Sequence, residues 1–419
     1  MISFPSLLGG SLAARASFLV SSPPVATSDL ATYVANTVSA VQALQTWYDT
    51  SEGLWNTTGW WNSANCLQVL ADFSALDADD ANDLNLGGVM ANTFTAAQQT
   101  VQTAAKTMLN GLGMVLIEST YTKTPARDLN GRGNSGFLNN FYDDEGWWAL
   151  ALIRSYDVTG VPGYLDVAQN IFEDMKAGGD DVCGGGIWWS KDKTYKNAIA
   201  NELYLAVAAS LANRVPARKQ EYLSIATQQW TWFNASGMIN SAGLINDGLK
   251  IKSDGSCVNN NQAVWSYNQG VVLGGLVELS KAMNGSTATK RANSTVAASS
   301  ALSSSSLLDA ASQIAAAAIS SLSVSGILTE SCEPDCFSGD VVQFKGIFMR
   351  NLHYLQLAAP QDAFRNFILA NADSIWTNDR DASNKLGMQW VGPASAGDGP
   401  TAGTHSSAMD ALVAAVAVV

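Results

Sequence analysis

Two adjacent aspartates, Asp143 and Asp144, stand at the start of an amphipathic helical pattern and are followed by Trp147 and Trp148. Cleavage of a glycosidic bond requires two carboxyl groups, because one protonates the leaving oxygen while the other attacks the anomeric carbon or activates water. Indole rings suit a site for sugars, because the flat apolar C–H face of a pyranose can pack against an indole. The residue types in this stretch therefore indicate a site for glycosidic bonds.

The spacing of the two aspartates bears on which of two known arrangements they form. Consecutive Cα atoms lie ~3.8 Å apart, and neighbouring helical positions diverge by roughly 100°. The two carboxyls can therefore sit about 5 Å apart, as in retaining glycosidases, whereas the separation of about 6.5–9.5 Å in an inverting pair is harder to reach. The alternative is that Asp143, Asp144 and Glu145 only interact favourably with the helix macrodipole.

The hydrophobic periodicity along the chain predicts an all-α protein. We expect helices over residues 28–48, 65–76, 92–110, 143–156, 164–176, 197–212, 217–233, 263–283, 307–322, 341–357, 361–376 and 404–418. A small hairpin is expected within residues 238–258, and loops over residues 55–61, 121–140, 178–189 and 285–306. About a dozen paired helices with one loop-rich face indicate an (α/α)6 barrel, a single domain over residues 28–419. An open helical solenoid is the alternative, which the lack of a sequence repeat disfavours.

Charge and histidine content exclude several classes of protein. The chain has a net charge of −13, only 23 lysines and arginines in 419 residues, and no basic run, so nucleic-acid binding is not expected. His353 and His405 are its two histidines and lie in no recognisable motif, although a histidine-ligated metal site or a Ser-His-Asp triad would need one of them. We therefore expect no metal, no cofactor, and catalysis by carboxylates.

The five cysteines allow two disulfides and one free thiol. We expect Cys183 to pair with Cys257, because both lie in loops near the proposed site, and Cys332 to close a tight loop with Cys336. Cys66 then remains as a buried free thiol. Sequence alone does not fix this connectivity, and a metal site at Cys332 and Cys336 would lack a second pair of ligands.

Several signals favour a secreted protein. Asn-x-Ser/Thr sequons occur at Asn56, Asn234, Asn284 and Asn293, and they agree with the expected disulfides. Residues 1–27 are expected to form a leader, although the usual basic n-region is missing. No run of 18 apolar residues exists, so no membrane span is expected, and the apolar residues 411–419 are predicted to belong to the last barrel helix. We expect a monomer.

Five segments resemble motifs of glycoside hydrolase family 76, the α-1,6-mannanases, whose fungal branch includes cell-wall proteins thought to act as transglycosidases. They read YDDEGWWALA (142–151), CGGGIWW (183–189), KNAIANEL (196–203), SYNQG (266–270) and, more weakly, FKGIFMR (344–350). The matches follow the family order from about residue 30 to the C-terminus. The resemblance implies an (α/α)6 barrel, an α-1,6-mannan or mannooligosaccharide substrate, Asp143 as the nucleophile and Asp144 as the acid/base.

Aromatic and polar residues of these segments are candidates for sugar binding. One of Trp147 and Trp148 should face the site and the other the core, because adjacent helical positions cannot share a face. For each of the other candidate residues, the alternative to sugar binding is core packing or helix capping. The residues that we expect to contact the substrate are Tyr142, Trp147, Trp188, Trp189, Asn201, Tyr267, Asn268, Gln269, Trp60 and Trp61.

Three functions remain compatible with the sequence. An endo-acting, retaining α-1,6-mannanase and a cell-wall transglycosidase differ only in whether water or a sugar takes up the mannosyl-enzyme intermediate. A catalytically silent mannan-binding protein is the third, and the intact Asp143-Asp144 pair disfavours it. Other (α/α)6 enzymes, such as inverting β-glucanases or polysaccharide lyases, usually draw acid and base from different segments. The weak leader and the lack of an anchor signal favour a soluble secreted hydrolase.

Overall fold

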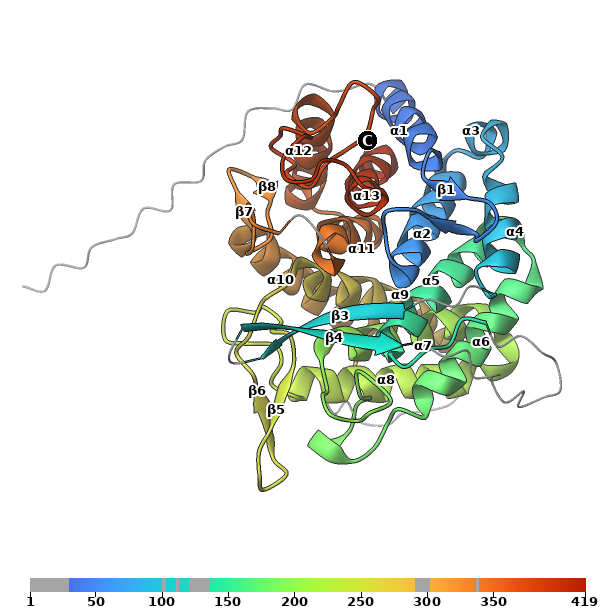
Figure 1. Cartoon of the computed structure of the whole chain (residues 1–419). Coiled ribbons are helices and arrows are strands. Elements are labelled where there is room, and N and C mark those ends of the chain that lie inside the picture. The colour runs from blue at the N-terminus through green and yellow to red at the C-terminus, as the bar shows by residue number, and fades with distance from the viewer. Residues whose placement is uncertain (1–29, 100–102, 111–112, 121–135, 291–301, 337–338) are drawn as a thin grey trace, which may run out of the picture.

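Six helices form a closed inner ring. The computed structural model describes residues 30–99, 103–110, 113–120, 136–290, 302–336 and 339–419. Each inner helix contacts the next one, and the last returns to the first, as Figure 1 shows for α11, α13 and α2. In ring order these helices are α2 (Trp60–Leu76), α5 (Tyr142–Thr159), α7 (Ala198–Arg214), α9 (Ser266–Lys290), α11 (Phe344–Ala358) and α13 (Ala402–Val418).

An outer layer of helices surrounds this ring, and each outer helix contacts an inner neighbour in the chain or across the closure. The short helix α3 (Ala78–Asp83) connects α2 to the outer layer. The outer helices are α1 (Leu30–Gln45), α4 (Leu86–Ala96), α6 (Pro162–Lys176), α8 (Lys219–Ala235), α10 (Ser304–Ser321) and α12 (Asp362–Asn378). Six helices around six are an (α/α)6 barrel, which confirms the predicted fold. The contact between α13 and α2 excludes the open solenoid.

The burial of the two layers explains their sequences. In α7 every residue from Ala198 to Ala212 is buried, and α13 is buried over nearly its whole length. Such helices are apolar or small on all sides, because neighbours surround them. The outer helix α6 instead buries one stripe, which includes Leu165, Ile171 and Met175. The inner helices therefore have their side chains enclosed by protein, and the polar side chains among them need hydrogen-bond or ion-pair partners.

Among the described residues, four antiparallel hairpins lie between the helices. Their strands are β1 (Tyr48–Asp49) with β2 (Leu54–Trp55), β3 (Thr103–Asn110) with β4 (Gly113–Thr120), β5 (Leu249–Ile251) with β6 (Cys257–Asn259), and β7 (Ser323–Val324) with β8 (Ile327–Leu328). The β5–β6 pair confirms the hairpin predicted within residues 238–258. The helix predicted over residues 92–110 is wrong in its second half, which forms β3. The last residue of β3, Asn110, is followed in the sequence by Gly111, and an Asn-Gly dipeptide is a hairpin signal that competes with the helical spacing.

Two predicted loops are shorter than expected. Trp60 and Trp61 belong to the first turn of α2, not to an aromatic loop over residues 55–61. Helix α9 runs to Lys290 and α10 begins at Ser304, so both ends of the predicted loop 285–306 are helical, and residues 291–301 lie outside the described residues. The predicted leader, residues 1–27, and residues 121–135 of the predicted loop 121–140 lie outside them as well.

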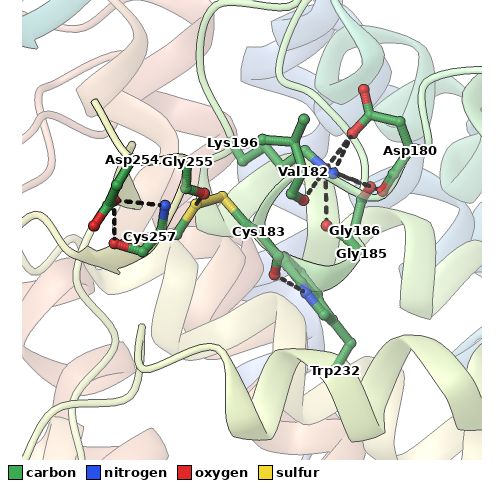
Figure 2. The surroundings of a disulfide bond; sticks show 11 residues. Asp180, Val182, Cys183, Gly185, Gly186, Lys196, Trp232, Asp254, Gly255 and Cys257 are labelled. Carbon is green, nitrogen blue, oxygen red and sulfur yellow. Dashed lines mark hydrogen bonds and ion pairs between the residues drawn. A yellow bond between two sulfur atoms is a disulfide. The ribbon is translucent and has the colours of Figure 1, made fainter. Parts of the chain in front are cut away.

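The cysteines behave as predicted. Cys183 is bonded to Cys257 (Figure 2) and Cys332 to Cys336. Cys66 is buried and free, and burial raises the pKa of its thiol to about 12, which keeps it in the unreactive thiol form.

Buried ion pairs join the inner helices. Arg350 in α11 donates to both carboxylate oxygens of Asp410 in α13, at 2.8 and 2.7 Å, and to the side-chain oxygen of Asn65 in α2, at 2.7 Å. Arg154 in α5 donates to Asp72 in α2 at 2.6 Å. These pairs cross-link four of the six inner helices. Within the described ranges, no helix is long and apolar enough to span a membrane.

Candidate active site

The first turns of the inner helices meet at one end of the barrel. The side-chain amide of Asn62 in α2 donates to Gln343, the residue before α11, at 2.8 Å. Gln343 donates in turn to the Ser406 hydroxyl in the first turns of α13, at 2.8 Å. Residues far apart in the sequence are thus brought to one place. Helix N-termini carry partial positive charge, so this end of the barrel favours carboxylates.

Four rings from four inner helices stand in a row at this end. Trp61 and Trp147 have centroids 5.4 Å apart and planes 24° apart. Trp147 and Tyr267 follow at 6.4 Å and 22°, and Tyr267 and Phe344 at 3.7 Å and 11°. We call these four residues the aromatic row. Their planes are close to parallel and each residue is less than 10% exposed, so together they form a packed stack of rings.

The tryptophans next to the aromatic row face elsewhere. Trp148 is fully buried and lies 5.5 Å from Trp60 and 4.6 Å from Phe137, measured between ring centroids. Trp147 and Trp148 therefore lie on different faces of α5, as their adjacent positions require. Trp60 packs against the rings of Trp148 and Phe137, and its contact with sugar stays a prediction.

Asp143 lies beside Trp189, whose indole N–H donates to the Asp143 carboxylate at 3.1 Å. Backbone pairing fixes this contact, because the N–H of Tyr142 donates to the carbonyl of Trp189 at 3.0 Å and Phe141 bridges to Ser190. The glycine-rich segment, residues 178–189, is thereby held against the start of α5. Asp143 is only 6% exposed, so its orientation depends on these neighbours.

Asp144 has a different partner. The side-chain amide of Asn139 donates to its carboxylate at 2.6 Å, and the Asp144 side chain is almost fully buried. The backbone N–H of the same asparagine donates to Glu145 at 2.9 Å. Asn139 thus orients Asp144 and Glu145, while the indole of Trp189 orients Asp143.

Glu145 belongs to a network of ion pairs. It is fully buried and forms an ion pair with Lys191 at 3.0 Å, and Lys191 also pairs with Asp174 at 2.7 Å. Burial raises the pKa of Glu145 well above its ordinary value, and the Lys191 charge opposes this effect. Glu145 therefore fastens the segment after Trp189 to α5 and α6 rather than completing the Asp143-Asp144 pair.

Two further carboxylates near the row were not predicted. Asp247, between α8 and β5, accepts a hydrogen bond from the Tyr195 hydroxyl at 2.5 Å. Burial raises the pKa of Asp247, and the nearby charge of Asp143 adds to the increase. Asp340 accepts from the indole N–H of Trp61 at 2.8 Å. Both residues lie in connecting segments without a local motif, so only the folded chain reveals them.

Tyr267 lies at the centre of these acids. Its pKa is raised well above the ordinary value, first by burial and then by the negative charges of Asp247, Asp143 and Asp340. The ring in the middle of the aromatic row is therefore surrounded by carboxylates from three different segments. Tyr267 is 9% exposed, and an aromatic ring beside carboxylate acceptors is a combination of residue types that suits a sugar with many hydroxyls.

The glycine-rich segment wraps around a buried ammonium group. Figure 2 shows Lys196 pointing into the turn, where Nζ donates to the Asp180 carboxylate at 2.8 Å and to the carbonyls of Val182, Gly185 and Gly186 at 2.7, 2.8 and 3.2 Å. Gly186 has a φ of +75°, and a Cβ there would collide with Trp232. The lysine, the glycines and the Cys183–Cys257 disulfide together fix the segment that carries Trp189.

Trp188 and Tyr142 contact the glycine-rich segment and its two lysine neighbours. The indole N–H of Trp188 donates to Asp180 at 2.6 Å, and Lys196 lies over its ring. The ring of Tyr142 lies against Gly178, with Lys191 above it. These two rings thus help to hold the glycine-rich segment in place, and their contact with sugar stays a prediction.

Three predicted polar residues are enclosed by protein. Asn201 exchanges two hydrogen bonds with the backbone of Ile187, at 2.7 and 2.9 Å. Gln269 does the same with the backbone of Ile245, at 2.8 and 2.9 Å. Asn268 is completely buried in the first turn of α9. Asn201 and Gln269 therefore fasten connecting segments to α7 and α9, and their contact with a ligand stays a prediction.

Both histidines are structural, as predicted. Burial lowers the pKa of His353 and of His405 to about 4, so both are neutral at pH 7. His405 accepts from the backbone N–H of Leu386 at 2.9 Å. Across the part of the chain that the structure describes, no three His, Cys, Asp or Glu side chains are grouped so as to hold a metal ion.

Comparison with known proteins agrees with this geometry. The family model of glycosyl hydrolase family 76 matches residues 26–418. Mannan endo-1,6-alpha-mannosidase DFG5 of Saccharomyces cerevisiae is 28% identical over 214 residues, 48% of this chain and 43% of DFG5. Mannan endo-1,6-alpha-mannosidase DCW1 of Candida albicans is 27% identical over 235 residues, 52% of this chain and 48% of DCW1. The chain thus matches less than half of the length of either relative.

Solved structures are similar over nearly the whole chain. One is the alpha-1,6-mannanase GH76A of Salegentibacter sp. HEL1_6, as an inactive variant with two consecutive aspartates replaced by asparagine, in complex with alpha-1,6-mannotriose; its TM-score is 0.70 at 21% identity, over 93% of this chain and 100% of that one. Another is Dfg5 from Chaetomium thermophilum in complex with glucosamine, with a TM-score of 0.68 at 16% identity, over 92% and 90%. The chain belongs to glycosyl hydrolase family 76.

Proposed function

We propose that this protein cleaves internal α-1,6-mannosidic bonds of mannan with retention of configuration. The observation that carries the proposal is the pair of adjacent carboxylates, Asp143 and Asp144, held by separate donors beside the aromatic row. The names of the relatives and the adjacent aspartates of the Salegentibacter mannanase support the same reaction. No residue outside the pair is needed for the proton and the nucleophile.

The proposed reaction has two displacements. Asp143 attacks the anomeric carbon while Asp144 gives its proton to the leaving glycosidic oxygen, which forms a mannosyl-Asp143 ester and frees the first fragment. Asp144 then removes a proton from water, the resulting hydroxide attacks the same carbon, and Asp143 leaves as a carboxylate. Each displacement inverts the anomeric centre, so the product retains the configuration of the substrate.

The surroundings suit these two roles. The Trp189 indole N–H fixes the direction of the Asp143 carboxylate, and Asn139 fixes that of Asp144. In the proposed complex the sugar rings lie along the aromatic row, and Asp247 and Asp340 accept hydrogen bonds from sugar hydroxyls. Positioning of this kind supplies a large part of a catalysed reaction's lower barrier.

Replacing Trp189 by Phe should slow the reaction while leaving substrate affinity nearly unchanged. The ring remains, but Asp143 loses its N–H donor, and a hydrogen bond to a charged group is worth about 1.5–3 kcal/mol. We therefore expect kcat to fall about 10- to 100-fold with little change in KM. Trp188→Phe is the matched control, because it removes the same kind of donor from Asp180 instead. Equal losses in both variants would contradict the role of Trp189.

Transfer to a sugar acceptor is the second candidate for the same intermediate. The observation that favours it is the low exposure of Asp143 and Asp144, 6% and 1%, because a site that excludes water prolongs the life of the ester. The sugar hydroxyl would then take the place of water in the second displacement.

Mass spectrometry of products from a linear, end-labelled α-1,6-mannooligosaccharide tests the proposal. Internal cleavage predicts several shorter labelled products at once, and transfer predicts products longer than the substrate at high substrate concentration. Linear α-1,2- and α-1,3-linked oligosaccharides serve as controls and should remain intact. An unchanged α-1,6 substrate that nevertheless binds would instead indicate a silent mannan-binding protein.

We also propose that the protein is located outside the cell, at or near the cell wall. The two disulfides suit an oxidising compartment, and the sequon asparagines Asn56 and Asn234 are exposed. Expression in a eukaryotic secretory host should therefore yield protein whose mass falls on treatment with an N-glycan endoglycosidase. Replacing both asparagines by Gln should reduce this mass difference, and an equal difference in that variant would place the glycans elsewhere.

A further inference from the structure

The turn from Glu330 to Cys336 contacts the starts of two inner helices at once. The Glu330 carboxylate accepts from the backbone N–H of Ser266, at 3.1 Å, and from its hydroxyl. Ser266 is the first residue of α9, where backbone N–H groups have no partner within the helix. Glu333 forms an ion pair at 2.7 Å with Lys345, the second residue of α11. One short turn thus binds α9 and α11.

The turn itself is rigidly built. The Glu333 carboxylate accepts the backbone N–H of Glu330 at 2.8 Å, with the same oxygen that binds Lys345. The N–H of Glu333 donates back to the carbonyl of Glu330 at 3.0 Å. The Cys332–Cys336 disulfide closes the turn around these bonds. A displacement of Glu333 would therefore be passed on to Glu330, and through it to α9.

The two anchored residues are direct neighbours of the aromatic row. Ser266 precedes Tyr267, and Lys345 follows Phe344, and the two rings are stacked with a centroid distance of 3.7 Å. Lys345 is almost fully buried, and its ammonium also donates to the carbonyl of Met388 at 2.7 Å. The Lys345 ammonium is thus bound by both the Glu333 carboxylate and the Met388 carbonyl. Since Phe344 precedes Lys345 in the chain, the position of the Phe344 ring relative to Tyr267 depends on the Glu333 carboxylate.

We propose that the Glu330–Cys336 turn is a clasp that sets the alignment of Tyr267 and Phe344, with Glu333 as the positioning residue. The clasp touches neither Asp143 nor Asp144 in the contacts described above. It therefore acts on the binding of sugar along the aromatic row and not on bond cleavage. This effect on sugar binding rests on the proposed function, whereas the coupling of the two helix starts does not.

Glu333→Gln tests the clasp, because it removes the charge of the ion pair while keeping the size of the side chain. We expect KM for an α-1,6-mannooligosaccharide to rise about 10-fold, in line with the loss of a charged hydrogen bond, and kcat to change less than about twofold. Glu278→Gln is the matched control. It removes a carboxylate that pairs with Arg214 at 2.7 Å in the middle of α9, about three turns from Ser266, and should leave KM unchanged.

A double-mutant cycle with Phe344→Leu separates positioning from general loss of structure. If Glu333 acts through the Phe344 ring, then Glu333→Gln should raise KM little further once the ring is gone. Additive effects of the two substitutions would overturn the proposal. Should Glu333→Gln fail to fold, the variant with Cys332→Ser and Cys336→Ser opens the turn but keeps both glutamates. It should raise KM in the same direction, and unchanged KM there would overturn the proposal too.

Hydrogen exchange gives a measurement that does not require activity. Amides in residues 266–270 and 344–348 should both exchange about 10-fold faster in Glu333→Gln than in the wild type, because local opening becomes easier. The control Glu278→Gln should leave these segments unchanged. Unchanged exchange in Glu333→Gln would overturn the clasp. A wild type without action on α-1,6-mannooligosaccharides would instead contradict the proposed function, and the exchange result would still decide whether the turn couples the two helices.

Discussion

Asp143→Asn and Asp144→Asn are each expected to lower kcat/KM by at least about 10³-fold while the barrel remains folded. Losing one member of a catalytic unit costs orders of magnitude in rate, because neither the nucleophile nor the proton donor has a substitute. The fold should persist, since an amide fills the same space and its oxygen can still accept from Trp189 or Asn139. Turnover of a linear α-1,6-mannooligosaccharide measures the loss, and circular dichroism with thermal unfolding checks the fold.

Asp166→Asn is the matched control for both variants. Asp166 is exposed on the outer helix α6, and its replacement should leave kcat/KM unchanged. Near-normal turnover in either Asp143→Asn or Asp144→Asn would contradict the assignment of the pair.

Added azide distinguishes the two roles. In Asp143→Ala it should take the place of the nucleophile and yield a mannosyl azide of inverted configuration. In Asp144→Ala it should trap the ester and yield a mannosyl azide of retained configuration. The opposite outcome would exchange the two assignments.

Arg350→Met is expected to lower the free energy of unfolding by about 3–5 kcal/mol, because it leaves a buried carboxylate without its partner. Arg350 is 2% exposed and donates to both oxygens of Asp410 and to Asn65, so it joins α11, α13 and α2. The closure between α13 and α2 is the contact that turns a row of helices into a ring. Urea unfolding at pH 7 measures the loss.

Removing both charges should be much less harmful than removing one. Arg350→Met combined with Asp410→Leu leaves no unpaired charge between α11 and α13, and replacing a buried pair by apolar residues is often neutral. We therefore expect the double variant to recover most of the stability lost in Arg350→Met. A double variant as unstable as the single one would show that packing, and not the unpaired carboxylate, accounts for the loss.

Local patterns in the sequence were sufficient to predict most of the barrel. Helical spacing predicted nearly every helix of the two layers, because each repeats apolar residues over several turns. The helix predicted from this spacing over residues 92–110 is wrong after Ala96, where α4 ends and the next element is the strand β3. Adjacent positions also predicted that Trp147 and Trp148 point in different directions, which follows from the helix alone.

The site depends on contacts that no local pattern encodes. Trp61, Trp147, Tyr267 and Phe344 lie on four helices and form a row only because the ring closes. Conversely, Asn201 and Gln269 seemed suitable for sugar hydroxyls, yet their amides hold the backbone of Ile187 and Ile245. A sequence motif identifies polar residues near a site, and only the fold shows which of them have hydrogen-bonding groups left for a ligand.

Proton NMR of the wild-type protein acting on a linear α-1,6-mannooligosaccharide tests the adjacent-carboxylate mechanism most directly. Spectra from the first minutes record the anomeric signal of new reducing ends before mutarotation equilibrates the α and β anomers. Shorter products that appear first as the α anomer are expected, since two displacements at one carbon restore its configuration. Products that appear first as the β anomer would mean a single displacement, and would contradict a mechanism in which Asp143 forms a covalent ester.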